Sequence, residues 1–283
     1  MSMSINTNAL SLNAQRNASN NATSLATTMA RLSSGLRINS SKDDAAGLAI
    51  ADRMNTQVRG MNVAIRNAND GISLAQTAEG GLASMNDMLQ RMRELAVQSV
   101  NSTNTSGDIA KLNNEYQQLG AEIGRTMSAT TFNGQAVLNG SSDYNFQVGA
   151  NSGTTDRITV ASSSITLSGA TALTNVISGT TASGLDTGTA LNNSAQIAAL
   201  DLAISAVNDR RATLGAVQSR FENTVSNLRI SVENQAAARG RIMDADFASE
   251  TANLSRSQIL QQAGTAMIAQ ANQLPQGVLA LLR

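Results

Sequence analysis

Apolar residues recur along most of this chain at intervals of three and four positions, the spacing that places side chains on one face of an α-helix. The spacing predicts a first amphipathic helix with apolar positions at Ile5, Ala9, Leu12, Ala22, Leu25, Met29, Leu32 and Leu36. It resumes at Val58 and continues to Val100, which predicts a second helix about 65 Å long. The apolar line of that helix includes Met61, Ala68, Ala75, Leu82, Met85, Leu89, Met92 and Ala96.

The pattern changes after this long helix. The turn-forming sequence NSTNTSGD at 101–108 ends it, and we expect a further helix from Ile109 to about Met127 to fold back beside it. The pairs Asn133-Gly134 and Asn139-Gly140 are turn signals because Asn and Gly tolerate positive φ. The stretches YNFQVG and RITV then predict a β-hairpin. Residues 161–194, rich in Ser, Thr, Gly, Ala and Asn, predict a small exposed insertion because they can bury little apolar surface.

The last third of the chain is helical again. A heptad pattern runs from Ile197 to Val232 with polar interruptions at Arg211 and Gln218. A final helix has its apolar line at Leu260, Gly264, Met267, Ala271, Leu274, Val278 and Leu281. Such long, narrow stripes must pack against other helices. We therefore expect a mainly α fold in which N- and C-terminal regions form a long antiparallel helical hairpin or coiled-coil rod, with a small region rich in β-hairpins between them.

The helical rhythm breaks at residues 35–55 and again at 239–247. Since the two terminal regions run back along each other, these breaks fall at the same height, and they predict a joint between two coaxial segments. Ser41 and Asp44 have the S-x-x-D spacing of a capping box, which predicts that a helix begins here. The alternative is a plain surface loop between two helices.

Composition excludes several classes of function. The chain of 283 residues has a net charge of zero, no Cys and no His, and aromatic residues make up 2% of it. Zero charge does not favour nucleic acid or anionic membranes as partners, and no segment approaches the roughly 20 apolar residues of a membrane span. Asp43 and Asp44 are adjacent carboxylates, and Asp244 and Asp246 are separated by one residue; we interpret both pairs as helix caps instead of metal ligands. We expect no enzyme activity, no metal and no cofactor.

Several segments, in order and at both ends, resemble bacterial flagellin: INTN at 5–8, LSSGLRINSSKDDAAGLAIADRM at 32–54, QRMRELAVQSVNSTN at 90–104, TTFNGQAVLNG at 130–140, ARGRIMDADFASE at 238–250 and QANQLPQGVLALLR at 270–283. The resemblance implies a short filament subunit for swimming motility. It implies a coiled-coil inner domain, D0, from residues 1–45 and 240–283, with a spoke at about 35–55. Residues 46–140 and 191–239 would form a helical rod, D1, and residues 141–190 a β-hairpin and a short variable insertion.

The resemblance also assigns residues to surfaces. A polymerisation seam would consist of Ile5, Leu12, Leu25, Met29, Leu32, Leu260, Met267, Leu274, Val278 and Leu281. The spoke would consist of Leu36, Arg37, Ile38, Asn39, Lys42, Asp43 and Asp44. Met88, Arg91 and Leu95 form a second stripe, rotated from the core line, and the family pattern implies that Arg91, Leu95 and Glu115 are sensed by an innate-immune Toll-like receptor.

The partners and location that follow are those of a flagellin. We expect a helical homopolymer, an export chaperone on the C-terminal helix, and junction and cap proteins of the hook-associated type. The N-terminus, MSMSINTNALSLNAQRN, has neither an early positive charge nor an apolar core, so we expect extracellular delivery by flagellar type III export without a cleaved signal peptide. Two alternatives are a cytoplasmic coiled coil of the chemoreceptor type and a hook–filament junction protein.

Overall fold

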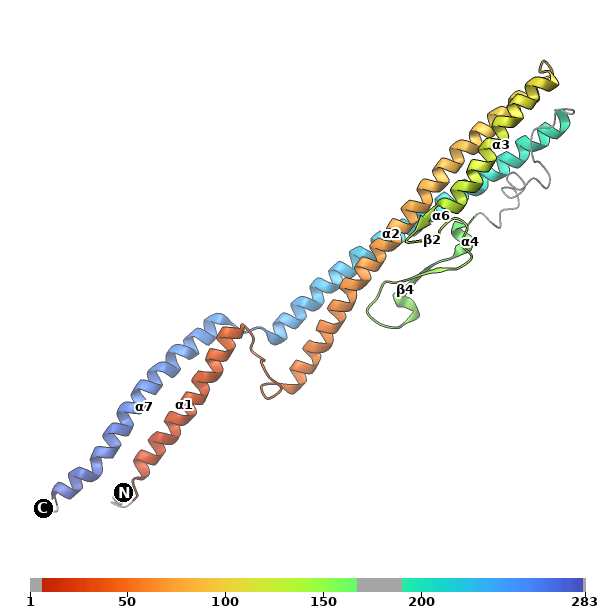
Figure 1. The fold of residues 1–283 in the computed structure, drawn as a ribbon. Helices are drawn as coiled ribbons and strands as arrows, with labels where there is room; N and C mark the ends of the chain where they lie inside the picture. The colour runs from red at the N-terminus through yellow and green to blue at the C-terminus, as the bar shows by residue number, and fades with distance from the viewer. Residues whose placement is uncertain (1–6, 167–189, 282–283) are drawn as a thin grey trace. The chain divides into compact units, whose positions relative to one another are not determined.

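The computed structural model describes residues 7–166 and 190–281 and divides the chain into two compact units. Residues 1–56 with 233–283 form what we call the terminal unit, and residues 57–232 form the central unit. The long helices are α1 (Ala9–Ser34), α2 (Ala45–Ser99), α3 (Ser106–Ala129), α6 (Ala190–Met243) and α7 (Phe247–Leu281) (Figure 1). The mainly α fold predicted from the apolar spacing is confirmed.

In the terminal unit, α1 and α7 lie side by side (Figure 1). They are antiparallel, since Asn8 at the start of α1 contacts Ala271 near the end of α7, while Arg31 contacts Glu250 near its start. The side chain of Asn8 caps α1 by accepting the Ser11 N–H at 3.0 Å. The pairing of the two terminal helices was therefore predicted correctly.

In the central unit, one apolar core joins α2, α3, α6 and the β segments. The predicted line of α2 is fully buried at Leu82, Met85, Leu89, Met92 and Ala96. Helix α3 begins with a capping box in which Thr105 and Asp108 each bond to the other's backbone N–H. It contributes Tyr116 and Ile123 to the core, and α6 contributes Leu200, Ala203, Val207, Leu214, Phe221 and Val225.

A polar interruption in the α6 heptad has a partner on α2. The side-chain amide of Gln218 donates to the Glu79 carboxylate at 3.0 Å. A buried amide costs free energy unless it is hydrogen-bonded, so this pair lets the seam tolerate a polar position.

Two small antiparallel β pairs follow α3. Strands β1 (Thr131–Phe132) and β2 (Gln135–Ala136) are joined by Asn133 and Gly134, whose φ values of 49° and 77° confirm the predicted turn. Gly140 has no positive φ, so the second Asn-Gly signal is not a turn of that kind. A Cβ on Gly140 would lie 2.6 Å from the Ala136 carbonyl oxygen, which indicates that close backbone approach is the reason for this glycine.

The predicted hairpin is confirmed as β3 (Tyr144–Gln147) and β4 (Arg157–Val160), with Tyr144 opposite Val160. The connection contains the 3₁₀ helix η1 (Thr154–Asp156), and the short helix α4 (Ser162–Ile165) follows β4. Asn67 of α2 donates to the Gln147 carbonyl at 2.9 Å, which ties the hairpin to the helices. Most of the predicted insertion, 167–189, lies outside the described residues.

Candidate functional site

The contact between α1 and α7 consists largely of small and polar side chains. Ser11 donates to the Asn272 side chain at 2.8 Å, and Asn8 donates to the Ala271 carbonyl at 2.7 Å. A Cβ on Gly264 would lie 3.7 Å from the Ala18 Cβ, so the backbones approach closely there. The buried residues of this unit include Ser11, Thr28, Glu250, Ser257 and Ala271. Among the side chains that the structure describes, the two helices thus pair without burying most of their large apolar residues.

Those large apolar side chains remain exposed. We call the following set the exposed apolar residues of the terminal unit: Leu10, Leu12, Met29, Ile50, Phe247, Ile259, Leu260 and Met267. Leu10, Leu260 and Met267 share a groove with Ala14 and Ala18. Large apolar residues exposed on one helix pair do not stabilise a monomer in water. They are typical of a surface that binds another molecule.

The predicted polymerisation seam overlaps this set in part. Leu12, Met29, Leu260 and Met267 are exposed, while Leu25 and Leu32 are half-buried. Ile5 lies outside the described residues, as do the side chains of Leu274, Val278 and Leu281. Leu10, Ile50, Phe247 and Ile259 were missed, because they fall off the apolar lines that the three-and-four spacing selects.

The predicted joint lies where two segments of the chain, 35–44 and 244–246, leave helical geometry. Gly35 ends α1 with φ 69°, and its carbonyl accepts the Ala245 N–H at 2.9 Å. Leu36 and Asp244 form an antiparallel β-bridge, and the Arg37 N–H donates to the Met243 carbonyl at 2.6 Å. The Arg37 guanidinium also reaches the Ile242 carbonyl, at 2.7 Å. The two interruptions therefore do pair.

The joint is shorter than predicted, because α2 begins at Ala45 and residues 45–55 are helical. The predicted Ser41–Asp44 capping box is wrong. Asp44 is itself the N-cap of α2, since its carboxylate accepts the Gly47 N–H at 2.8 Å and its carbonyl accepts the Leu48 N–H. A Cβ on Gly47 would collide with the Asp44 carboxylate, so glycine at 47 leaves room for this cap.

The other spoke residues close the loop on itself. The Asp43 carboxylate accepts both backbone N–H groups of Asn39 and Ser40, at 3.1 and 2.9 Å, and the Ser40 hydroxyl at 3.0 Å. These bonds, led by the Ser40 N–H, lower the pKa of Asp43. Ile38 is buried and anchors the loop, while Lys42 is exposed. The loop is a structured element of the terminal unit.

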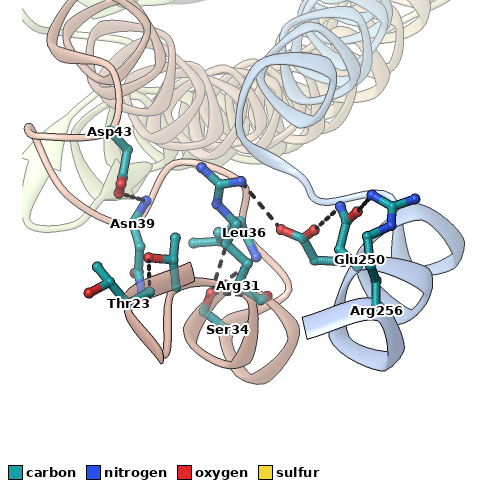
Figure 2. A network of polar contacts seen from close by, with 10 residues as sticks. Thr23, Arg31, Ser34, Leu36, Asn39, Asp43, Glu250 and Arg256 are labelled. Carbon is teal, nitrogen blue, oxygen red and sulfur yellow. Dashed lines mark hydrogen bonds and ion pairs between the residues drawn. The ribbon is translucent and has the colours of Figure 1, made fainter. Parts of the chain in front are cut away.

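A chain of polar contacts crosses between the terminal helices near this joint (Figure 2). Arg31 of α1 pairs with Glu250 of α7 at 3.3 Å, and the Glu250 side chain itself is 10% exposed. Glu250 also accepts from Asn253 at 3.1 Å, and Asn253 accepts from Arg256 at 3.2 Å. The buried carboxylate thus receives donors from both helices.

The predicted receptor patch is divided between surface and core. Arg91 of α2 pairs with Glu115 of α3 and with Glu94, each at 2.9 Å, on an exposed face. The bonds to Glu115 and then Glu94 raise the pKa of Arg91. Leu95 is 1% exposed and belongs to the core of the central unit. The second stripe that Met88 and Leu95 define is a further packing surface, because α2 contacts two helices and needs two apolar lines.

No metal-binding constellation is present among residues 7–166 and 190–281. These described residues contain no cluster of three His, Cys, Asp or Glu side chains that could hold an ion. Asp43 and Asp44 are instead occupied with backbone donors. None of the described helices combines the length and apolar character needed to cross a membrane.

Comparison with known proteins covers both ends of the chain. Residues 5–143 match the bacterial flagellin N-terminal helical region, and residues 197–282 match the bacterial flagellin C-terminal helical region. A flagellin of Halalkalibacterium halodurans is 47% identical, with 99% of this chain and 100% of the relative covered. A flagellin of Bacillus subtilis is 40% identical over 99% of this chain and 100% of its own length. The crystal structure of Bacillus cereus flagellin is 31% identical, with a TM-score of 0.48, and the match covers 62% of this chain and 94% of that chain.

Proposed function

The chain belongs to the bacterial flagellin family, and from that premise we propose that it polymerises into the flagellar filament through the exposed apolar residues of its terminal unit. Flagellins are structural subunits of the extracellular filament and not enzymes, which removes the chemoreceptor alternative. The observation that supports the proposed mode of assembly is the difference, within the terminal unit, between the residues that pair the two helices and those that stay exposed. Its internal contact uses Ser11, Asn272 and Ala271, while Leu12, Leu260 and Met267 are left for other copies.

The driving force is burial of those side chains between subunits. Burying apolar surface contributes about 25 cal/mol per Å², and an array of copies would cover leucines and methionines that one helix pair cannot. Contacts between different faces of identical subunits give a closed ring when the rotation between copies closes and an open helical filament when it does not; the proposed filament is the open case. The joint at 35–44 would hold the terminal unit in the shape that these contacts need.

Two variants test this mode of assembly. Leu12→Ser and Leu260→Ser should raise the critical concentration for polymerisation by about tenfold or more, measured by light scattering with filament seeds and by electron microscopy. The matched controls, Leu12→Met and Leu260→Met, keep an apolar side chain of similar volume and should assemble normally. Wild-type assembly by both serine variants, with unchanged monomer circular dichroism, would place the interface elsewhere.

We also propose that the exposed Arg91–Glu115 pair is read by a host Toll-like receptor. Support comes from its position, because the pair joins α2 to α3 on an exposed face where charged side chains are accessible. Leu95 lies in the core, so its part would be to hold α2 in place without touching the receptor.

The receptor proposal is tested with monomer in a reporter-cell assay. Arg91→Ala and Glu115→Ala should each weaken signalling by about tenfold, with helix content unchanged. Arg93→Ala is the matched control, because Arg93 is an exposed arginine of the same helix that pairs with Asp201 of α6 instead. Equal signalling by all three variants would reject the patch.

Export and end-capping partners complete the proposal. We place the flagellar export chaperone on α7, whose exposed Ile259, Leu260 and Met267 need cover before assembly. Junction and cap proteins of the hook-associated type would contact the subunits at the two filament ends, where the same residues lack a neighbouring copy. Removal of residues 248–283 should abolish chaperone binding in a pull-down with type III export components, and full binding by the truncated chain would reject the site.

A further inference from the structure

The methionines of this chain are divided sharply by exposure. The sequence has 11 of them, of which Met1 and Met3 lie outside the described residues. Met29 on α1 is 54% exposed and Met267 on α7 is 62% exposed. By contrast, Met61, Met85 and Met92 are buried, and Met54, Met88, Met127 and Met243 are half-buried. Both exposed methionines of the described chain therefore lie on the terminal unit, among its exposed apolar residues.

Exposure decides how fast a methionine thioether is oxidised. A hydroperoxide transfers one oxygen atom to Sδ, so that the O–O bond breaks, an S=O bond forms, sulfur loses two electrons and the peroxide is reduced to water or an alcohol. The product is a polar sulfoxide in place of an apolar thioether. Met85 and Met92, enclosed by the central core, are out of reach of this reaction while the core stays folded.

We propose that Met29 and Met267 are oxidation sites through which peroxide blocks assembly of the free subunit. The inference rests on the proposed assembly through the exposed apolar residues. Met267 shares its groove with Leu10 and Leu260, so a sulfoxide there places a polar oxygen in the surface that must be desolvated. Assembly buries the same thioethers, so the filament protects them and the unassembled subunit is the sensitive form.

Peptide mass spectrometry after hydrogen peroxide treatment of full-length monomer tests the sites. Met29 and Met267 should be oxidised about tenfold or more faster than Met85 and Met92. In preformed filaments the rate at both sites should fall to that of the buried methionines. Comparable rates at Met29, Met267 and Met92 in monomer would overturn the assignment, as would unchanged rates in filaments.

Assembly of the treated protein tests the consequence. Oxidised wild-type subunit should show a critical concentration about tenfold higher, and methionine sulfoxide reductases of both epimer specificities should restore it without any change of sequence. The variant Met29→Leu/Met267→Leu should assemble after peroxide as well as before it, because leucine keeps the apolar volume without the sulfur. The control Met92→Leu should remain as sensitive as wild type.

Two results would overturn the effect on assembly: normal assembly of protein carrying both sulfoxides, or equal loss of assembly in the Met29→Leu/Met267→Leu variant. Neither depends on the test of the assembly mode itself, because Leu12→Ser and Leu260→Ser are measured without oxidant. Normal polymerisation of those serine variants would reject the shared interface, whereas normal polymerisation of the sulfoxide form rejects only the oxidation sites.

Discussion

The ring of Phe146 meets the ring of Phe221 edge to face, with centroids 5.3 Å apart and planes at 86°. Phe146 belongs to β3 and Phe221 to α6, so the contact fastens the hairpin to a helix. Gly71 of α2 lies against the same ring, since a Cβ built there would be 2.7 Å from the Phe221 Cζ. One fully buried aromatic residue thus joins three elements of the central unit.

Phe221→Ala should therefore be among the most damaging substitutions in the central unit. Loss of a buried phenylalanine costs about 3–5 kcal/mol of unfolding free energy, because the cavity it leaves cannot be filled by the two helices. Urea denaturation of the monomer measures the loss. Phe221→Leu, which keeps most of the volume, should recover much of it, and an equal loss for both substitutions would contradict a packing role.

Gly71→Ala and Gly80→Ala should have opposite effects although both replace a glycine inside α2. Alanine favours helix by about 1 kcal/mol over glycine, and a Cβ at Gly80 meets nothing within 4 Å, so that variant should be more stable. At Gly71 the new methyl group collides with the enclosed Phe221 ring, so the variant should be less stable by about 1–3 kcal/mol. Thermal denaturation of both variants measures their stabilities relative to wild type. Stabilisation by Gly71→Ala would show that the Phe221 ring can move.

Much of the helical architecture could be predicted from the spacing of apolar residues. The ends of α3, the β3–β4 hairpin and the paired interruptions at Leu36 and Asp244 all lie where turn residues and period changes indicate. Local signals of this kind are strong because each depends on neighbouring positions only. The Asn133-Gly134 turn is an example, since its positive φ values are a property of two residues.

The parts that could not be predicted depend on tertiary contact. Leu95 is buried because α2 packs against two helices, which a single helix period does not reveal. Asp44 is the cap of α2 because the helix begins three residues later than a Ser41–Asp44 box requires. The contact that small and polar side chains make between α1 and α7 was also missed. Ser11, Asn272 and Glu250 lie outside the apolar lines, so the spacing of apolar residues gives no sign of them.

The Arg31–Glu250 pair should matter more for stability than its single contact suggests. Arg31→Met leaves the nearly buried Glu250 carboxylate without its charged donor, which costs about 1–2 kcal/mol after allowance for the partly exposed Arg31. Adding Glu250→Leu should restore most of the loss, because no unpaired charge then remains. Hydrogen exchange of α1 and α7 amides measures both effects. Arg93→Met, which breaks the exposed Arg93–Asp201 pair, is the control and should change protection little.

Tyr116 should make the central unit sensitive to alkali. Burial raises the pKa of Tyr116 to about 12, from an ordinary value of 10.0. Between these values the unfolded phenol loses its proton while the folded phenol keeps it, so stability falls as pH rises from about 10 to about 12. Tyr116→Phe should remove this fall, and since the described chain offers the hydroxyl no hydrogen-bond partner, the variant should not be less stable at neutral pH. Ultraviolet titration of the two tyrosines checks this prediction, with Tyr144 as the reference. Equal midpoints for both tyrosines would contradict it.

Asp43 should make the joint sensitive to acid. Its pKa is lowered by the Ser40 and Asn39 donors, so the loop is stabilised above the ordinary carboxyl pKa of 3.8 and loses this contribution as pH falls through the lower folded value. NMR hydrogen exchange of the Asn39 and Ser40 amides across the acid range, corrected for intrinsic rates, measures the opening. Asp43→Asn keeps an acceptor but cannot titrate, so its corrected protection should stay flat, and identical profiles for the two proteins would show that another group opens the loop.

Removal of residues 260–283 should abolish filaments while leaving the central unit folded. The deletion takes away Ala271 and Asn272, which hold the start of α1, and with them Leu260 and Met267 of the proposed interface. Most of the stability of a helix in a protein comes from packing of its amphipathic face, so α1 amides should lose protection in the truncated monomer. The core from Ala68 to Val225 contains none of the deleted residues and should keep its protection. Electron microscopy and hydrogen exchange of the same samples give both readouts, with full-length subunit as the control. Filaments built from the truncated chain would mean that the pairing of α1 with α7 is not needed for assembly.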